Sequence, residues 1–253
     1  MRVEGVSLRY RADGRLVHAV EDVSFDVRAG EKFIILGPSG CGKSTLLSAV
    51  AGFLRPVAGR ILLDGRPVER PGPDRVVVFQ EFDQLLPWRT VLGNVAYPLR
   101  VARRLGDRES RARAARFVDM VGLEGFAHAY PHTLSGGMKQ RVAIARALAL
   151  DAAVLLMDEP FASLDALTRT RMQEELNQIW AQTRKTILFV THSIQEAVLL
   201  GSRILVLTPG PGRVRAILDN EASGAPLDSA PFTAMQARVR AILEGPADGR
   251  GEA

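Results

Sequence analysis

A glycine-rich segment that contains a single lysine carries the clearest chemistry of the sequence. It reads Gly37-Pro38-Ser39-Gly40-Cys41-Gly42-Lys43-Ser44-Thr45. Apolar residues 33–36 precede it as a short predicted strand, and an apolar helical pattern follows it from Leu46 onward. A strand, a glycine-rich loop and a helix in this order form a phosphate-binding loop, in which backbone N–H groups and the helix N-terminus stabilise negative charge. The segment therefore predicts a site for nucleotide phosphates.

The side chains of this loop have separate expected roles. Lys43 reaches the β- and γ-phosphates, the Ser44 hydroxyl ligates Mg²⁺, and Thr45 is placed to touch the α-phosphate. The chain has four lysines against 29 arginines. A lysine at this position therefore indicates a need for the compact charge of an ammonium rather than the planar guanidinium of an arginine. Cys41 is interpreted as a small, inert loop residue and not as a nucleophile.

Two adjacent carboxylates follow a second apolar strand, residues 154–157. They are Asp158 and Glu159, at the carboxyl end of the strand, where ligands bind in open α/β sheets. Because successive strand residues point apart, the two acids are expected to differ in role. Asp158 suits the shell of a Mg²⁺ ion, and Glu159 suits orienting or deprotonating an attacking water.

A serine and two glycines, Ser135, Gly136 and Gly137, stand before a predicted helix at residues 142–150. Serine is a favourable helix N-cap, and glycines beside it leave a bare helix end that can bind an anion. Taken alone, the segment could be any helix start.

In this order, the motifs resemble the ATP-binding subunit of an ABC transporter over residues 3 to about 220. The resemblance implies an ATPase that uses ATP and Mg²⁺ and forms a head-to-tail dimer with two sandwiched nucleotides. Ser135, Gly136 and Gly137 of one subunit would then contact the γ-phosphate held by the other.

The resemblance assigns further residues. Gln80, expected to close a strand at 76–79, corresponds to the glutamine that reaches Mg²⁺ or the attacking water. Asp165 corresponds to an acid at the dimer interface, and His192, after a strand at 186–191, to the histidine that bonds the γ-phosphate. Tyr10 is expected to stack on adenine. Without the resemblance, Gln80 could be a polar strand end, His192 a structural histidine and Tyr10 ordinary core packing.

The expected fold class is α/β, with a phosphate-loop NTPase core around a mainly parallel sheet. Alternation of strands and helices implies parallel βαβ units covered on both faces. An antiparallel β subdomain is expected at the N-terminus from strand patterns at 3–10, 22–28 and 60–64, and a helical subdomain is expected to be inserted at about 82–150. We expect an ATPase domain over 1–220, and a C-terminal helix and a frayed tail over 221–253.

Finer motifs resemble the importers of nitrate, sulfonates and taurine. They are Leu85-Leu86-Pro87-Trp88, Leu164-Asp165-Ala166-Leu167-Thr168-Arg169 and Gly210-Pro211-Gly212-Arg213-Val214. The Leu85–Trp88 segment is expected to be an exposed apolar patch, which marks a partner surface, and the resemblance implies that it receives a transmembrane permease subunit. A solute-binding protein is implied indirectly.

Composition bounds the alternatives. The chain has 253 residues, a formal charge of +5 and one cysteine, so no internal disulfide is possible. We find no signal peptide and no apolar stretch long enough to span a bilayer, and therefore expect attachment to the cytoplasmic face of the membrane through the permease.

Two other classes of protein were considered. The basic charge is the only support for a nucleic-acid-linked ATPase, and the zinc-binding cysteines, coiled coils or second phosphate loop of such proteins are absent from the sequence. We therefore expect no nucleic acid partner. A small-molecule kinase or GTPase would leave Ser135–Gly137, Gln80 and His192 unexplained.

Overall fold

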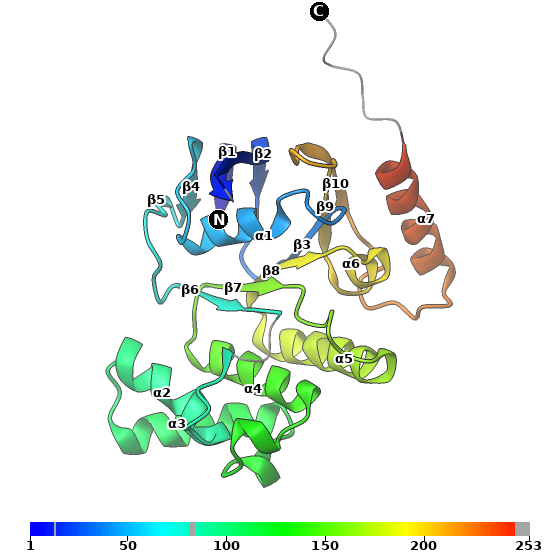
Figure 1. Ribbon diagram of the computed structural model, residues 1–253. Coiled ribbons are helices and arrows are strands. Elements are labelled where there is room, and N and C mark those ends of the chain that lie inside the picture. The colour runs from blue at the N-terminus through cyan, green and yellow to red at the C-terminus, as the bar shows by residue number, and fades with distance from the viewer. Residues whose placement is uncertain (13, 81–83, 246–253) are drawn as a thin grey trace, which may run out of the picture. The chain divides into compact units, whose positions relative to one another are not determined.

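A computed structural model describes residues 1–12, 14–80 and 84–245, which separate into two compact units (Figure 1). Unit 1 comprises Met1–Pro71 and Thr186–Ala253, and unit 2 comprises Gly72–Lys185. The expected frayed tail lies almost entirely in 246–253, outside the described residues.

Unit 1 contains an antiparallel sheet in the order β2-β1-β4-β5 (Figure 1). Its strands are β1 (Arg2–Ala12), β2 (Arg15–Asp26), β4 (Ala58–Leu63) and β5 (Arg66–Pro67). The predicted antiparallel region is confirmed, and Asp64 and Gly65 form the turn between β4 and β5 with φ of 49° and 77°. The second strand begins at Arg15 rather than at residue 22. Its first residues are mostly exposed, so backbone pairing with β1 extends the hairpin where apolar alternation is weak.

The second sheet of unit 1 has the order β10-β9-β3-β8 within this unit. Its strands are β3 (Lys32–Leu36), β8 (Thr186–Thr191), β9 (Arg203–Leu207) and β10 (Val214–Asp219). Strand β3 pairs in parallel with both β8 and β9, and β10 is an antiparallel edge. Every residue of β3, β8 and β9 is buried, as expected of a parallel sheet covered on both faces. The helices of unit 1 are α1 (Lys43–Ala51), α6 (Ile194–Leu200) and α7 (Ala230–Glu244).

Unit 2 joins a parallel strand pair to a group of helices. The strands are β6 (Arg75–Val78) and β7 (Val154–Asp158). The helices are α2 (Val91–Ala102), α3 (Asp107–Met120), α4 (Gly136–Ala149) and α5 (Ala166–Thr183), with the short 3-10 turns η2 (Glu124–Phe126) and η3 (Pro131–Thr133). The α2 and α3 helices lie beside α4 (Figure 1).

Two elements of unit 2 differ from the predicted bounds. Helix α4 begins at Gly136, six residues before the predicted helix, because the cap at Ser135 allows glycines to form the first turn. Strand β6 ends at Val78, so Gln80 lies two residues beyond the strand instead of closing it.

None of the helices in the described parts of the chain is long and apolar enough to cross a membrane.

A buried amide fixes the end of α6 in unit 1. The Asn220 Nδ2 donates to the carbonyl oxygens of Val198 at 2.8 Å and Gly201 at 2.6 Å, and its Oδ1 accepts from the Ala222 N–H at 3.1 Å. Asn220 is 6% exposed, so these groups have little access to water. The amide thus holds the C-terminal end of the helix that follows residue 192.

Replacing this amide should destabilise the protein. Asn220→Ala leaves two carbonyls and one N–H unpaired, so we expect the free energy of unfolding to fall by about 2–3 kcal/mol. For a domain of this size that corresponds to a Tm lower by roughly 5–10 °C in thermal unfolding followed by circular dichroism. Gln178→Ala, at an exposed position of α5, is the control and should leave the Tm unchanged. Equal Tm values for the two variants would contradict the role of Asn220.

Candidate functional site

The glycine-rich loop connects the end of β3 to the start of α1. Gly42 is the N-cap of α1, has a left-handed φ of 92° and offers no side-chain cap. A Cβ there would lie 2.4 Å from the Ala19 carbonyl oxygen, so both the conformation and the space require glycine. The first N–H groups of α1 are therefore left without a side-chain acceptor from the cap, which suits them to an anion.

Lys43 is buried and bonds back onto its own loop. Its Nζ donates to the carbonyl oxygens of Gly37 at 2.9 Å and Pro38 at 3.0 Å. The ammonium is therefore held at the loop, while the next residue, Ser44, is exposed and Thr45 is half-buried. A fixed cation, backbone N–H groups and hydroxyls form a donor set that fits phosphate groups.

One oxygen of this loop, the Ser44 hydroxyl, also suits Mg²⁺. This ion usually takes one or two protein oxygens and completes its shell with substrate phosphates and water. The described residues hold no group of three or more His, Cys, Asp or Glu side chains that could bind a metal, and Mg²⁺ beside a nucleotide does not need one. The Ser44 hydroxyl, which is exposed, can supply one such protein oxygen.

A second loop of unit 1 packs against the phosphate loop and was missed as part of the site. The Gly212 N–H donates to the Ala19 carbonyl at 2.9 Å, and its carbonyl accepts from the Glu21 N–H at 2.9 Å. A Cβ on Gly212 would lie 2.2 Å from the Cys41 carbonyl oxygen. The Gly-Pro-Gly pattern was visible in the sequence, but its distance from Cys41 along the chain hid this contact.

His192 follows β8 in unit 1 and is exposed. The turn that carries it is shaped by Thr191, whose Oγ1 donates to the Glu196 Oε2 at 2.5 Å and accepts from the Ser193 N–H at 3.0 Å. Glu196 is buried in the first turn of α6 and had not been singled out from the sequence. The pair fixes the backbone on both sides of His192.

Tyr10 lies on β1 opposite Val17 and is 39% exposed. This exposure excludes the alternative that Tyr10 is an ordinary core residue. Its ring is thus accessible at the surface of unit 1.

The two acids of unit 2 lie at the carboxyl end of β7, as predicted, and both are half-buried. Asp158 is the last residue of the strand, whereas Glu159 lies beyond it with a left-handed φ of 42°. We expected alternation along the strand to point the two side chains apart. Glu159 lies outside the strand, so alternation does not explain the direction of its side chain. The left-handed backbone at Glu159, uncommon for a residue other than glycine, sets the direction of that side chain.

Two helix starts of unit 2 carry the other predicted residues. Ser135 caps α4, its Oγ accepting from the Met138 N–H at 3.3 Å, and Gly136 and Gly137 form the first turn. Asp165 caps α5 by accepting from the Thr168 N–H at 3.0 Å, and this bond holds the pKa of the Asp165 carboxyl below its usual range.

Arg169, on the first turn of α5, holds the loop before this helix. Its guanidinium donates to the carbonyl oxygens of Phe161 at 3.2 Å and Leu164 at 2.8 Å. Arg169 therefore positions the loop that leads to Asp165, a role that the sequence analysis did not assign.

The expected apolar patch is only partly exposed. Leu85 is 5% exposed and belongs to the core, so the prediction is wrong for this residue. Leu86 is half-buried, while Pro87 is exposed and Trp88 is 69% exposed. The accessible part of the segment is therefore Pro87 and Trp88, and Gln80 is exposed before it.

The candidate residues divide between the units. Unit 1 supplies the phosphate loop, Tyr10 and His192, and unit 2 supplies Gln80, Ser135–Gly137, Asp158, Glu159 and Asp165.

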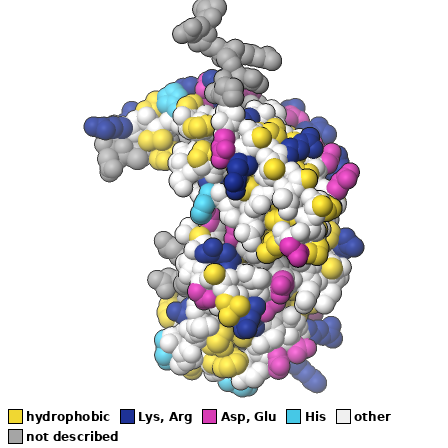
Figure 2. Space-filling model, turned by 90° about the vertical axis from the view of Figure 1, so that its right-hand side faces the viewer, with side chains coloured by type: hydrophobic (Ala, Val, Ile, Leu, Met, Phe, Trp, Pro, Cys, Tyr) yellow, Lys and Arg dark blue, Asp and Glu magenta, His cyan; other side chains and the backbone are white. Residues whose placement is uncertain are grey.

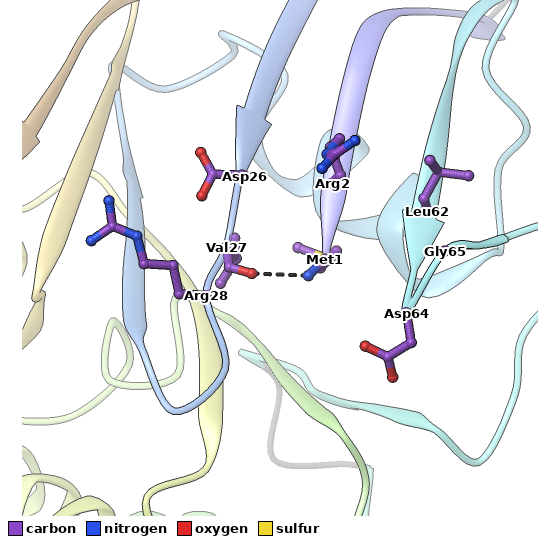
Figure 3. A pocket seen from close by; sticks show the side chains of 8 residues that line it. All are labelled: Met1, Arg2, Asp26, Val27, Arg28, Leu62, Asp64 and Gly65. Carbon is purple, nitrogen blue, oxygen red and sulfur yellow. Dashed lines mark hydrogen bonds between the residues drawn. The ribbon is translucent and has the colours of Figure 1, made fainter.

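A pocket of about 330 Å³ in unit 1 is separate from these residues (Figure 3). It lies at the ends of β1, β2 and β4, where the Met1 amino group donates to the Val27 carbonyl at 2.9 Å. It shares no residue with the phosphate loop, and its charged lining residues, Arg2, Asp26, Arg28 and Asp64, are of both signs. Basic and acidic side chains are also interspersed over the face drawn in Figure 2.

The mainly parallel sheet and the phosphate loop define the class as an α/β nucleotide-binding ATPase. A family model described as ABC transporter matches residues 20–162, and the chain belongs to this family. It is 49% identical to the taurine import ATP-binding protein TauB of Rhizobium johnstonii over the whole of both chains. It is also 49% identical to the nitrate import ATP-binding protein NrtD of Synechococcus elongatus over 76% of this chain and 70% of that one.

Solved structures agree with the fold. The dimeric post-hydrolysis state of the ATP-binding cassette MJ0796, bound to ADP and Pi, superposes with a TM-score of 0.74 at 33% identity and covers 86% of this chain and 97% of that one. The cbiO1 protein of Clostridium perfringens, part of the transporter complex cbiONQ, superposes with a TM-score of 0.78 at 29% identity and covers 97% and 95%. The expected fold class and the ABC-type ATPase activity are confirmed.

The contact at Gly212 predicts an effect on nucleotide binding. In Gly212→Ala the added methyl displaces the Cys41 carbonyl and with it the phosphate loop. We expect the Kd for ATP, measured by isothermal titration, to rise about fivefold, which corresponds to roughly 1 kcal/mol. Gly125→Ala is the control, because a Cβ there meets nothing within 4 Å. An unchanged Kd for Gly212→Ala would show that this loop does not support the site.

Proposed function

We propose that this chain is the ATP-hydrolysing subunit of an importer for a small anionic solute, such as a sulfonate or nitrate. The observation that carries the proposal is the presence of two helix starts suited to phosphate, at Gly42 and at Ser135. One nucleotide in one chain needs only the first. The second is accounted for when Ser135, Gly136 and Gly137 complete the ATP site of a partner copy.

The residues of the phosphate loop bind and orient the substrate. The backbone groups that surround the phosphates belong to Gly37, Pro38, Ser39, Gly40, Cys41 and Gly42. Lys43 neutralises the β- and γ-phosphates, and Thr45 contacts the α-phosphate. Mg²⁺, when bound, neutralises charge on the phosphoryl oxygens, and Ser44, Gln80 and Asp158 would hold it. Tyr10 stacks on adenine.

The remaining residues act on water and on the γ-phosphate. Glu159 accepts a hydrogen bond from the attacking water and orients or deprotonates it, Gln80 helps to place that water, and His192 donates to a γ-phosphate oxygen. Asp165 lies at the interface between the two copies. Catalysis then comes mainly from positioning and from neutralisation of charge.

The assembly follows from the same assignments. Residues 1–220 form the ATPase domain with the helical insertion at about 82–150, and residues 221–253 supply a C-terminal helix and tail. Two copies form a head-to-tail dimer that closes on ATP and opens after hydrolysis. Trp88 and Pro87 contact the transmembrane permease subunits, which bind a solute-binding protein on the other side. The chain is thus peripheral, at the cytoplasmic face of a bacterial-type membrane.

The support for a transported anion is the similarity to the taurine and nitrate import proteins. The alternative, an ABC ATPase linked to nucleic acid, is not favoured, because the similar importers and the interspersed charge in Figure 2 give it no support.

The first test concerns Glu159. Glu159→Gln keeps the size of the side chain and one acceptor oxygen but removes the base. We expect ATP hydrolysis, measured by phosphate release, to fall by about 10²–10⁴-fold. ATP binding should be retained, and gel filtration with ATP should show a more stable dimer. Turnover equal to that of the unmodified protein would disprove the role of Glu159.

The second test concerns the permease contact. Trp88→Ala removes an exposed aromatic anchor, so we expect affinity for the permease subunits to fall about tenfold while ATP hydrolysis by the isolated subunit is unchanged. Phe126→Ala is the control, since Phe126 is also an exposed aromatic of unit 2. Equal co-purification of both variants with the permease would place the contact elsewhere.

A further inference from the structure

Gln84 uses its side chain as a substitute for a strand partner. Its Nε2 donates to the Phe79 carbonyl at 2.9 Å, and its Oε1 accepts from the Phe79 N–H at 3.3 Å. Both backbone groups of Phe79 are thereby paired directly after β6 has ended at Val78. The next residue is Gln80, so the amide of Gln84 fixes the backbone from which the Gln80 side chain starts.

Arg146 of α4 holds Gln84 in turn. Its Nη1 donates to the Gln84 carbonyl at 2.6 Å and its Nη2 to the Gln84 Oε1 at 3.3 Å. Arg146 is half-buried, and this burial lowers the pKa of its guanidinium from the usual value. A buried guanidinium is costly unless its N–H groups are bonded, and two of these bonds are made to one glutamine.

The segment after Gln84 is held by a second buried amide. The Asn94 side chain of α2 is fully buried, and its Oδ1 accepts from the Leu86 N–H at 2.8 Å. Its Nδ2 lies 3.1 Å from the carbonyl oxygens of Leu86, Arg89 and Thr90. The backbone on both sides of Trp88 is therefore fixed to α2, while Gln84 is fixed to α4.

Helix α4 connects this segment to Ser135. Arg146 lies ten residues after Gly136 on the same helix, which corresponds to about 15 Å along its axis. A continuous helix is stiff over this length, so a force on Gln84 is passed to the helix start. No other role assigned above uses Gln84 or Arg146.

We propose that Gln84 and Arg146 are positioning residues that join Gln80 and the Trp88 segment to the helix that begins at Ser135. This inference rests on the proposed function for the roles of Gln80, Trp88 and Ser135. A shift of Trp88 against a membrane partner is then transmitted both to Gln80, which places the attacking water, and to Ser135, which contacts the nucleotide of the partner copy.

The local part of the proposal is tested without activity. Gln84→Leu keeps a side chain of similar volume but loses both bonds to Phe79 and one acceptor of Arg146. We expect amide hydrogen exchange at Phe79 to become roughly tenfold faster or more, as backbone protection is lost. Gln182→Leu, at an exposed position near the end of α5 in the same unit, should leave it unchanged. Unchanged exchange at Phe79 in Gln84→Leu would overturn the proposal.

The positioning role is tested by a split between kcat and KM. We expect kcat for ATP hydrolysis in Gln84→Leu to fall about tenfold while KM for ATP stays within about twofold, because the phosphate loop lies in the other unit. Arg146→Met should behave in the same way, and Arg146→Lys, which keeps one donor for the Gln84 carbonyl, should recover part of the kcat.

The outcomes separate the two proposals. Faster exchange at Phe79 with an unchanged kcat in Gln84→Leu would overturn the positioning role. An equal fall in kcat in Arg146→Met and Arg146→Lys would also overturn it. If the unmodified protein and Glu159→Gln hydrolysed ATP at the same rate, the proposed function would fail. The exchange experiment would then still decide whether Gln84 fixes Phe79.

Discussion

Burial of parallel strands on both faces is the constraint on which the rest of this structure depends. All residues of β3, β8 and β9 are buried, so a polar side chain inside them needs a protein partner, as Thr191 has in Glu196. Side chains that must reach a ligand are therefore expected at the end of a strand or directly after it. Gly37 follows β3, His192 follows β8, and Asp158 ends β7. The location of these three residues is a consequence of this burial.

Backbone conformation then decides direction. Gly42 uses a left-handed φ to begin α1 while the chain passes close to Ala19, and Glu159 uses a left-handed φ to leave the line of β7. The first has no steric cost because glycine lacks a Cβ, whereas the second costs on the order of 1 kcal/mol in a glutamate. The strained backbone at Glu159 agrees with its proposed catalytic role, in which the direction of the side chain matters more than local stability.

Side chains that bond to the main chain hold the irregular segments around these residues. Asn220, Asn94 and Arg169 each bond to two or more backbone groups of a loop, and Gln84 pairs with both groups of Phe79. Each such bond contributes about 1 kcal/mol, and the cost of its loss is largest where the carbonyl or N–H is buried. These bonds thus hold loop residues in place even though the loops belong to no sheet or helix.

The sequence by itself determined the class of fold, the phosphate loop and the acids after β7, because strand period, helix period and cap residues act between neighbours along the chain. It did not determine that Leu85 is buried, that Gly212 packs on Cys41 or that Arg146 holds Gln84. These contacts join segments that are distant along the chain. Burial and hydrogen bonding between such segments depend on which surfaces meet after folding, so only the tertiary structure decided them.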